Sequence, residues 1–420
     1  MSLEKSHKFN EDWEWIKAKD FMIFNPRESV KKGTVIKNVP MDKIEPKTKE
    51  IPSYEVTEYK GGVKFRNGDT LMARITPCLE NGKISQVSIL DYNEIGAGST
   101  EFIVLREKEG VSDKDFIYYL SNSEFFKEPA IKSMVGSSGR QRVQRDVVEN
   151  LDIYVPSLET QKKIGKLLSL FDKKISLNKM INRNLEEQLS LIFDDIFVKC
   201  SEYDENSLVK TDWGKIPKDW KNIDFGELIQ ITSGDRPDEK SETKTAEFNI
   251  PLFGASKIMG YTKEYLYDED ILIIGRVGTH GVVQRVNYPC FPSDNTFVIK
   301  SKYYGFVYQL LKRIDYDSLN TGSTQPLITQ KSLKTVNVVL PDENSLSEFE
   351  NISKVFFDKI YLNQNEITSL TKLRDTLIPK LMSGEIDVSK INCDMQEIST
   401  NNWDNKFTVP LQNNLIKVIS

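Results

Sequence analysis

The chain of 420 residues has only two histidines, His7 and His280, and four cysteines that lie far apart. With so few histidines, a histidine-rich metal site and a Ser-His-Asp triad are disfavoured. No two cysteines form a CxxC pair, so the sequence predicts neither a zinc ribbon nor a disulfide framework. The common metal and triad chemistries are therefore not expected in this chain.

Long apolar runs and an excess of basic charge are also missing. No apolar run reaches the ~20 residues of a spanning helix, and the first residues do not resemble a signal peptide, so we expect a cytoplasmic protein. The chain has 57 basic and 62 acidic residues, which gives a net charge of −5. Any surface that binds nucleic acid must therefore come from a local concentration of Lys and Arg.

One order of features occurs twice along the chain, at a spacing of about 190 residues. Each copy has a Trp-containing opening, an acidic turn before an apolar strand and an Arg, a second strand, a short amphipathic segment, a Gly-Ser loop, a strand that ends in Pro, and a long helical pattern. Seven features in one order are hard to attribute to chance. The matched segments are GDTLMARITPCLENGK from Gly68 and EDILIIGRVGTHGVV from Glu269, GSSGRQRVQ from Gly136 and GSTQPLITQ from Gly322, and LDIYVP and VNVVLP, which end at Pro156 and Pro341.

The first helical pattern has apolar residues in alternating steps of four and three, from Ile164 to Ile196. A strict seven-residue period indicates a narrow seam that faces another helix. Asn178 and Asn182 interrupt this seam, and a polar residue in such a seam fixes the register of the helix pair at some cost in stability.

The second helical pattern repeats the seam 185 residues later, less regularly. Asn363 falls on the position of Asn178, while Ser353 and Arg374 interrupt the apolar series. Because a repeated plan favours a pseudo-two-fold axis, we expect the two helices to pair antiparallel.

These patterns predict an α+β fold. Two β-rich globular domains in pseudo-two-fold repeat are joined by two long antiparallel coiled-coil helices. The expected boundaries are a first domain at 1–156, a first helix at 157–200, a second domain at 201–341, a second helix at 342–386 and a C-terminal tail at 387–420.

Polar, Gly-bearing loops follow several of the predicted strands and carry the candidate DNA-binding residues. Arg, Lys and backbone N–H groups hold phosphates, while Arg, Asn, Gln, Thr and His can read base edges. A solvated turn is the competing interpretation of each loop; the three arginines at 140–145 form the strongest cluster. The candidates are Arg74, Thr76, Asn81, Lys83, Ser137, Arg140, Gln141, Arg142, Arg145, Arg236, Arg276, Thr279, His280, Ser323, Thr324 and Gln325.

The order of elements and several phrases resemble the DNA-specificity (S) subunit of Type I restriction-modification systems. The resemblance covers nearly the whole chain, and its motifs are specific only jointly. Besides the segments above, the phrases that carry it are GSTEFIVL, LFGASKIMGYT, CFPSDNTFVI and the helix end KLRDTLIPKLMSGEI from Lys372 to Ile386.

The resemblance implies a non-catalytic subunit that binds double-stranded DNA. In this family, each of two target-recognition domains reads one half of a split, asymmetric target, and the helix pair sets the spacer. Two modification (M) subunits dock on it, bind S-adenosylmethionine and methylate adenine N6, and two restriction (R) subunits that use ATP and Mg²⁺ join in some systems. No cofactor is expected in this chain itself, and no membrane partner.

Three alternatives remain open from the sequence. The chain could be an orphan specificity subunit that serves a methyltransferase encoded elsewhere, or a coiled-coil scaffold with no DNA role. A stand-alone endonuclease is a third hypothesis, although no carboxylate-lysine metal site is evident. Sequence-specific binding to a split site, weakened by salt, distinguishes the first interpretation from the others.

Overall fold

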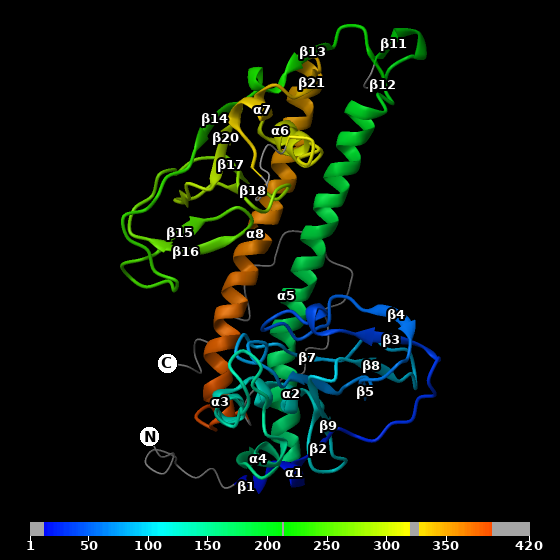
Figure 1. Cartoon of the computed structure of the whole chain (residues 1–420), viewed down its shortest axis with the longest axis vertical. Helices are drawn as coiled ribbons and strands as arrows, with labels where there is room; N and C mark the ends of the chain where they lie inside the picture. The colour runs from blue at the N-terminus through cyan, green and yellow to red at the C-terminus, as the bar shows by residue number, and fades with distance from the viewer. Residues whose placement is uncertain (1–11, 212–213, 320–326, 389–420) are drawn as a thin grey trace. The chain divides into compact units, whose positions relative to one another are not determined.

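The computed structural model describes residues 12–211, 214–319 and 327–388. The chain divides into two compact units. Unit 1 contains the described residues up to Leu177 together with those from Glu366 onward, and unit 2 is Asn178–Asn365. Each unit has a β-rich domain and one segment of each of two long helices (Figure 1).

Unit 1 is built on a four-stranded antiparallel sheet with the strand order β2-β9-β6-β7. Strand β6 is buried along its whole length, and so are the first four residues of β9, which explains their continuous apolar runs. A second sheet has the order β4-β3-β8-β5, in which β3 and β8 are parallel. The bounds are β2 Met22–Phe24, β3 Val35–Val39, β4 Glu55–Glu58, β5 Val63–Phe65, β6 Thr70–Ala73, β7 Ile84–Gln86, β8 Gly96–Gly98 and β9 Phe102–Glu107.

Unit 2 repeats this plan. Its antiparallel sheet has the order β14-β20-β17-β18, and its second sheet, β16-β15-β19, again contains one parallel pair, β15 with β19. The main difference is that the second sheet of unit 2 has three strands instead of four. The bounds are β14 Gln230–Ser233, β15 Ile250–Phe253, β16 Ile258–Thr262, β17 Ile271–Gly275, β18 Val283–Val286, β19 Phe291–Pro292 and β20 Thr296–Lys300.

Short helices and a two-stranded pairing complete each domain. The pairing of β1 with β10 in unit 1, and of β13 with β21 in unit 2, joins the opening of each domain to the strand that leads into its long helix. The bounds are β1 Trp13–Lys17, α1 Ala18–Phe21, α2 Lys114–Asn122, α3 Glu124–Lys132, α4 Arg145–Glu149 and β10 Asp152–Pro156 in unit 1, and β11 Leu208–Thr211, β12 Gly214–Pro217, β13 Lys221–Asp224, α6 Tyr304–Leu311, α7 Gln330–Lys334 and β21 Asn337–Leu340 in unit 2.

The long helices are α5, Leu158–Phe193, and α8, Glu343–Met382. Each begins after a side chain that accepts a hydrogen bond from the first turn, as expected at a helix N-terminus. The Ser157 hydroxyl accepts from the backbone N of Thr160 at 3.4 Å. Asp342 Oδ1 accepts from the backbone N of Asn344 and of Ser345, both at 3.0 Å. A π-helical turn, Asp194–Val198, follows α5.

In each unit the segments of α5 and α8 are antiparallel. In unit 1, Asp172 pairs with Arg374, and Lys174, two residues farther along α5, pairs with Glu366, eight residues back along α8. Arg374 looks in the sequence like an interruption of the seam, but it is a buried residue whose charge is matched by the opposite helix.

In unit 2 the predicted polar seam positions lie in the helix pair. Asn363 Nδ2 donates to Asn182 Oδ1 at 2.8 Å, and Asn182 Nδ2 donates to the carbonyl of Ile360 at 3.4 Å. Asn178 is buried. Ser353 is buried as well, because it packs against Gly305 of α6, where a Cβ would lie 2.1 Å from the serine Oγ.

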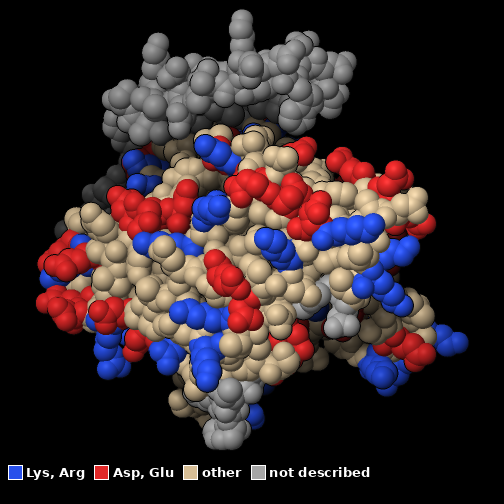
Figure 2. All heavy atoms as spheres, turned by 90° about the horizontal axis from the view of Figure 1, so that it is seen from above, with Lys and Arg blue, Asp and Glu red and all other residues tan. Residues whose placement is uncertain are grey.

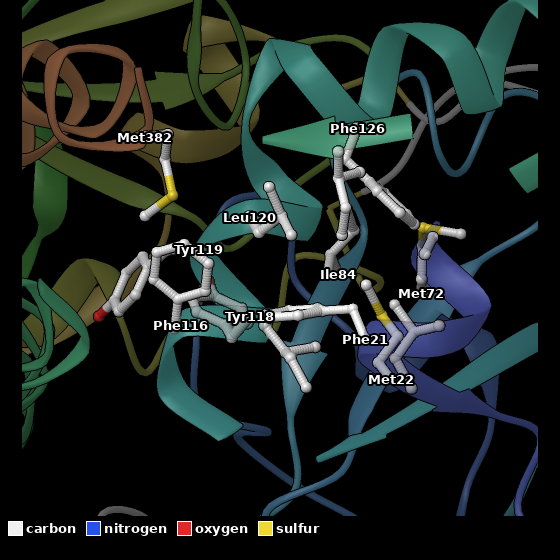
Figure 3. Packing of buried hydrophobic residues seen from close by; sticks show 14 of the residues in the cluster. Phe21, Met22, Met72, Ile84, Phe116, Tyr118, Tyr119, Leu120, Phe126 and Met382 are labelled. Atoms are coloured by element: carbon white, nitrogen blue, oxygen red, sulfur yellow. The ribbon is translucent and has the colours of Figure 1, made fainter. Parts of the chain in front are cut away.

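The end of α8 is part of the hydrophobic core of unit 1. Leu377, Leu381 and Met382 are at most 2% exposed and belong to the same buried cluster as α2. Figure 3 shows part of this core, with Met382 on the side of Tyr119 and Leu120. The two β-rich domains have four-stranded sheets of the same strand order, and the two long helices have antiparallel segments within each unit. These features confirm the predicted fold class. Among the described residues, no helix has the length and apolarity needed to cross a membrane.

Candidate nucleic-acid interface

Arg74 occupies a fixed place at the end of β6 in unit 1. Its backbone N donates to the carbonyl of Glu101 at 2.9 Å, and its carbonyl accepts from the backbone N of Val143 at 2.8 Å. The guanidinium Nη2 lies 3.5 Å from the carbonyl of Val143. Its Nε is buried and has no hydrogen-bond partner within the described ranges. The strand end therefore holds the backbone of Arg74 firmly and leaves its side chain under-satisfied.

The loop after Gly136 approaches this strand end. Arg142 donates hydrogen bonds to the carboxylate of Glu101. Its Nε lies 3.0 Å from Oε1 and 2.9 Å from Oε2, and its Nη2 lies 2.6 Å from Oε1. The hydrogen bonds from Arg142 lower the pKa of Glu101, burial opposes them, and the charges of Arg142 and Arg74 lower it further. The backbone N of Thr76 donates to the carbonyl of Gln141 at 3.0 Å. The structure thus brings four candidates together: Arg74, Thr76, Gln141 and Arg142.

The arginine cluster 140–145 is not uniformly available for DNA. Arg142 is held by Glu101, and Arg145 Nε lies 2.5 Å from Glu149 on its own helix. Arg140 is exposed, and no ion pair is formed by it within the described part of the chain. Ser137 is exposed beside it and accepts the backbone N–H of Arg140 at its carbonyl, at 3.0 Å.

The two remaining candidates of unit 1 lie in the turn before β7. Asn81 is exposed. Lys83 is half-buried, and its Nζ donates to the carbonyl of Met41 at 2.9 Å. Lys83 therefore ties this turn to the short 3-10 turn that follows β3, whereas Asn81 is open to solvent.

Arg276 is placed in unit 2 as Arg74 is in unit 1. Its backbone N donates to the carbonyl of Asn295 at 3.0 Å, and its carbonyl accepts from the backbone N of Ile328 at 2.9 Å. Its Nε is again buried with no partner among the residues described. The guanidinium lies 5.6 Å from the centre of the Phe297 ring.

The other candidates of unit 2 lie near this arginine in the sequence. Thr279 is exposed, and His280 Nε2 lies 3.4 Å from the carbonyl of Arg276. Arg236 is exposed in the loop after β14, where its backbone N donates to Asp235 at 2.8 Å. Ser323, Thr324 and Gln325 lie outside the described residues.

The charge on the surface is mixed rather than uniformly basic. Figure 2 shows Lys and Arg interspersed with Asp and Glu over the face that it displays. No group of His, Cys, Asp and Glu suited to a metal ion occurs in the parts of the chain that the structure describes.

Glu101 is the residue near this site that sequence reasoning missed. It is 41 residues from Arg142, so no local pattern joins the two. Its position directly before β9, in the segment STEFIVL, was the only available signal. Asn295 lies directly before β20 in unit 2, and no other local pattern marks it as a residue near the site.

Comparison with known proteins gives one consistent result. The family model described as Type I restriction modification DNA specificity domain matches residues 10–187 and 217–372. The Type I restriction enzyme MjaIX specificity subunit of Methanocaldococcus jannaschii is 26% identical over 312 residues, which are 68% of this chain and 71% of that protein. The EcoAI specificity subunit of Escherichia coli is 32% identical over 179 residues, 40% of this chain and 30% of that protein.

A solved structure supports the fold. The crystal structure of a Type I restriction-modification system S subunit from M. genitalium has a TM-score of 0.55 and 17% sequence identity, covering 90% of this chain and 98% of that one. The two matched regions of the family model span well over half of the sequence. The chain therefore belongs to the family of Type I restriction-modification DNA specificity subunits.

Proposed function

We propose that this chain selects the DNA target of a Type I restriction-modification complex by reading a split, asymmetric site. The recognition domains are 1–156 and 201–341, and each reads one half of the target. The observation that carries the proposal is that two domains of one topology present different side chains on the same backbone frame. A common frame with different side chains gives two half-sites of different sequence.

The long helices set the spacer between the half-sites and dock two modification subunits, which methylate adenine N6. Support for a spacing role comes from the length of α5, 36 residues, or about 54 Å of continuous helix. Further support comes from the hydrogen-bonded asparagines and the buried ion pair, which fix the register of the helix segments. Restriction subunits join the same complex where the locus encodes them.

The test of this function is a methylome of the host that detects N6-methyladenine, with and without the gene. We expect one split motif with two unlike halves to lose methylation when the gene is deleted and to regain it on complementation. Unchanged methylation in a host that expresses the chain and its modification subunit would refute the proposal.

The spacing role has a separate test. Four helical residues inserted after Asn182 and a matching four inserted before Asn363 lengthen both antiparallel helices by ~6 Å and keep the two asparagines opposite each other. The methylated motif should then keep both half-sites and gain about two base pairs of spacer, since each base pair adds ~3.4 Å. A changed half-site, or an unchanged spacer in an active complex, would contradict the assigned roles.

A further inference from the structure

The two units supply an internal comparison, because the same hydrogen bonds identify matched positions. Arg74 and Arg276 each follow a central strand and donate from the backbone to the residue shortly before the neighbouring strand, Glu101 or Asn295. The residue after each arginine forms an isolated antiparallel bridge, Ile75 with Arg142 and Val277 with Leu327. The frame therefore matches Arg74 with Arg276, Glu101 with Asn295, and Arg142 with Leu327.

The two units have the same residue at one of the three matched positions and different residues at the other two. Glu101 and Arg142 form an ion pair in unit 1, and both are replaced in unit 2, by Asn295 and Leu327. The charge and its partner are lost together, as expected when the main role of Arg142 is to bind Glu101. The remaining matched position, that of Arg74 and Arg276, is arginine in both units.

Arg74 and Arg276, the arginines present in both units, lower the folding stability of the free protein. Each has a buried Nε without an acceptor, and neither forms an ion pair within the residues described. A buried donor left unsatisfied costs about 1–3 kcal/mol. Both arginines are only half-buried as whole residues, and an arginine kept at the same place in both units fits a partner that is common to both half-sites.

We propose that Arg74 and Arg276 are matched phosphate anchors, each of which binds a DNA backbone phosphate and sets the register of its domain on its half-site. The proposal rests on the proposed function. The fork of donors in a guanidinium matches phosphate oxygens. A base contact specifies sequence, whereas a phosphate contact positions the protein on any sequence. An arginine shared by domains that read unlike half-sites fits the phosphate role.

The experiment compares Arg74→Gln, Arg276→Gln and the double variant in the complete complex with modification subunits. Binding is measured by fluorescence anisotropy on the cognate duplex and on a duplex with both half-sites scrambled, across a salt series. We expect each single variant to bind both duplexes about tenfold more weakly. The slope of log K against log salt should fall by ~0.9 for each single variant and ~1.8 for the double variant.

Two further variants control for folding and for the loss of charge anywhere on the surface. Lys60→Gln removes an exposed lysine between β4 and β5 that lies outside both loop clusters and both long helices, and it should leave the salt slope unchanged. Arg74→Lys keeps the charge but loses the fork, so it should weaken binding and retain the slope. Because Arg276 lies in the other unit, a folding defect in one arginine variant leaves the second as an independent test.

The methylated motif provides the decisive readout. An unchanged motif with uniformly weaker binding supports phosphate anchoring. A motif that becomes degenerate at one base position shows base reading instead, and unchanged binding shows a purely internal role; either result overturns the proposal. Failure of the proposed function looks different, because the wild-type complex itself would then show no preference for the cognate duplex.

Discussion

The Asp172–Arg374 pair joins α5 to α8 inside unit 1, and its removal gives the sharpest test of the helix pairing. The side chains are 3% and 7% exposed, and Asp172 also accepts from the Tyr119 hydroxyl. Replacing Arg374 with Met leaves a buried carboxylate with that hydroxyl as its remaining donor among the described residues. Leaving one partner of a buried pair uncompensated costs about 3–5 kcal/mol.

The double variant Asp172→Leu/Arg374→Met should be much more stable than Arg374→Met alone. Removing both charges eliminates the uncompensated carboxylate, and an apolar replacement of a buried pair is commonly neutral or stabilising. The corresponding positions of unit 2, 185 residues away, are the buried apolar residues Phe357 and Leu189. The Tyr119 hydroxyl loses its acceptor, so we expect the double variant within about 1–2 kcal/mol of the wild type.

Differential scanning calorimetry of the full chain provides the measurement. For a unit of this size, 1 kcal/mol shifts the melting temperature by about 2–4 °C, so Arg374→Met should lower the transition of unit 1 by about 10 °C. Lys372→Met, which removes an exposed cation of the same helix, is the control and should cause no comparable shift. A shift below ~2 °C for Arg374→Met, or a double variant as unstable as the single one, would refute the reasoning.

Three further predictions concern unit 2. Burial alone would raise the pKa of Asp342, but hydrogen bonds from the hydroxyl and backbone N of Ser345, from Tyr203 and from Trp220 lower it to about 2. A depressed carboxyl pKa stabilises the fold above the unfolded pKa and loses this effect as pH falls from ~4 to ~2, so Asp342→Asn should flatten that part of a urea-denaturation pH profile. Gly305→Ala should destabilise by about 1–3 kcal/mol, because its Cβ would lie 2.1 Å from Ser353 Oγ, and Ser353→Gly should recover part of the loss in thermal melting. Asn182→Leu should lower the free energy of unfolding by about 1–3 kcal/mol, because the Asn363 amide loses this acceptor. In thermal melting, Asn182→Leu/Asn363→Leu should be more stable than Asn182→Leu alone.

The periodicity of the sequence predicted the repeat and the long helices because both depend on local spacing. The seven-residue seam correctly placed buried residues such as Ile164, Phe171 and Leu377. The same periodicity could not explain Arg374, since its partner is 202 residues away and lies beside the apolar series of α5 rather than in it. A local pattern shows a charged interruption but not the opposite charge that compensates it.

The candidate interface was less predictable for the same physical reason. Loop composition identified Arg74 and Arg142 as residues suited to DNA, but not that Arg142 is held by Glu101. Strand order and the parallel pairs of the second sheets depend on long-range pairing, which no local pattern encodes.

The discontinuous make-up of unit 1 has a consequence for how the chain folds on the ribosome. Unit 2 is a continuous stretch, whereas unit 1 needs the last helical residues, Leu377, Leu381 and Met382, to close its core. At ~5–20 residues per second, the roughly 200 residues between Leu177 and Met382 take about 10–40 s to synthesise. The core of unit 1 therefore stays open until the end of α8 has been synthesised. Unit 2 has all of its residues once Asn365 has been added, so unit 2 is complete first.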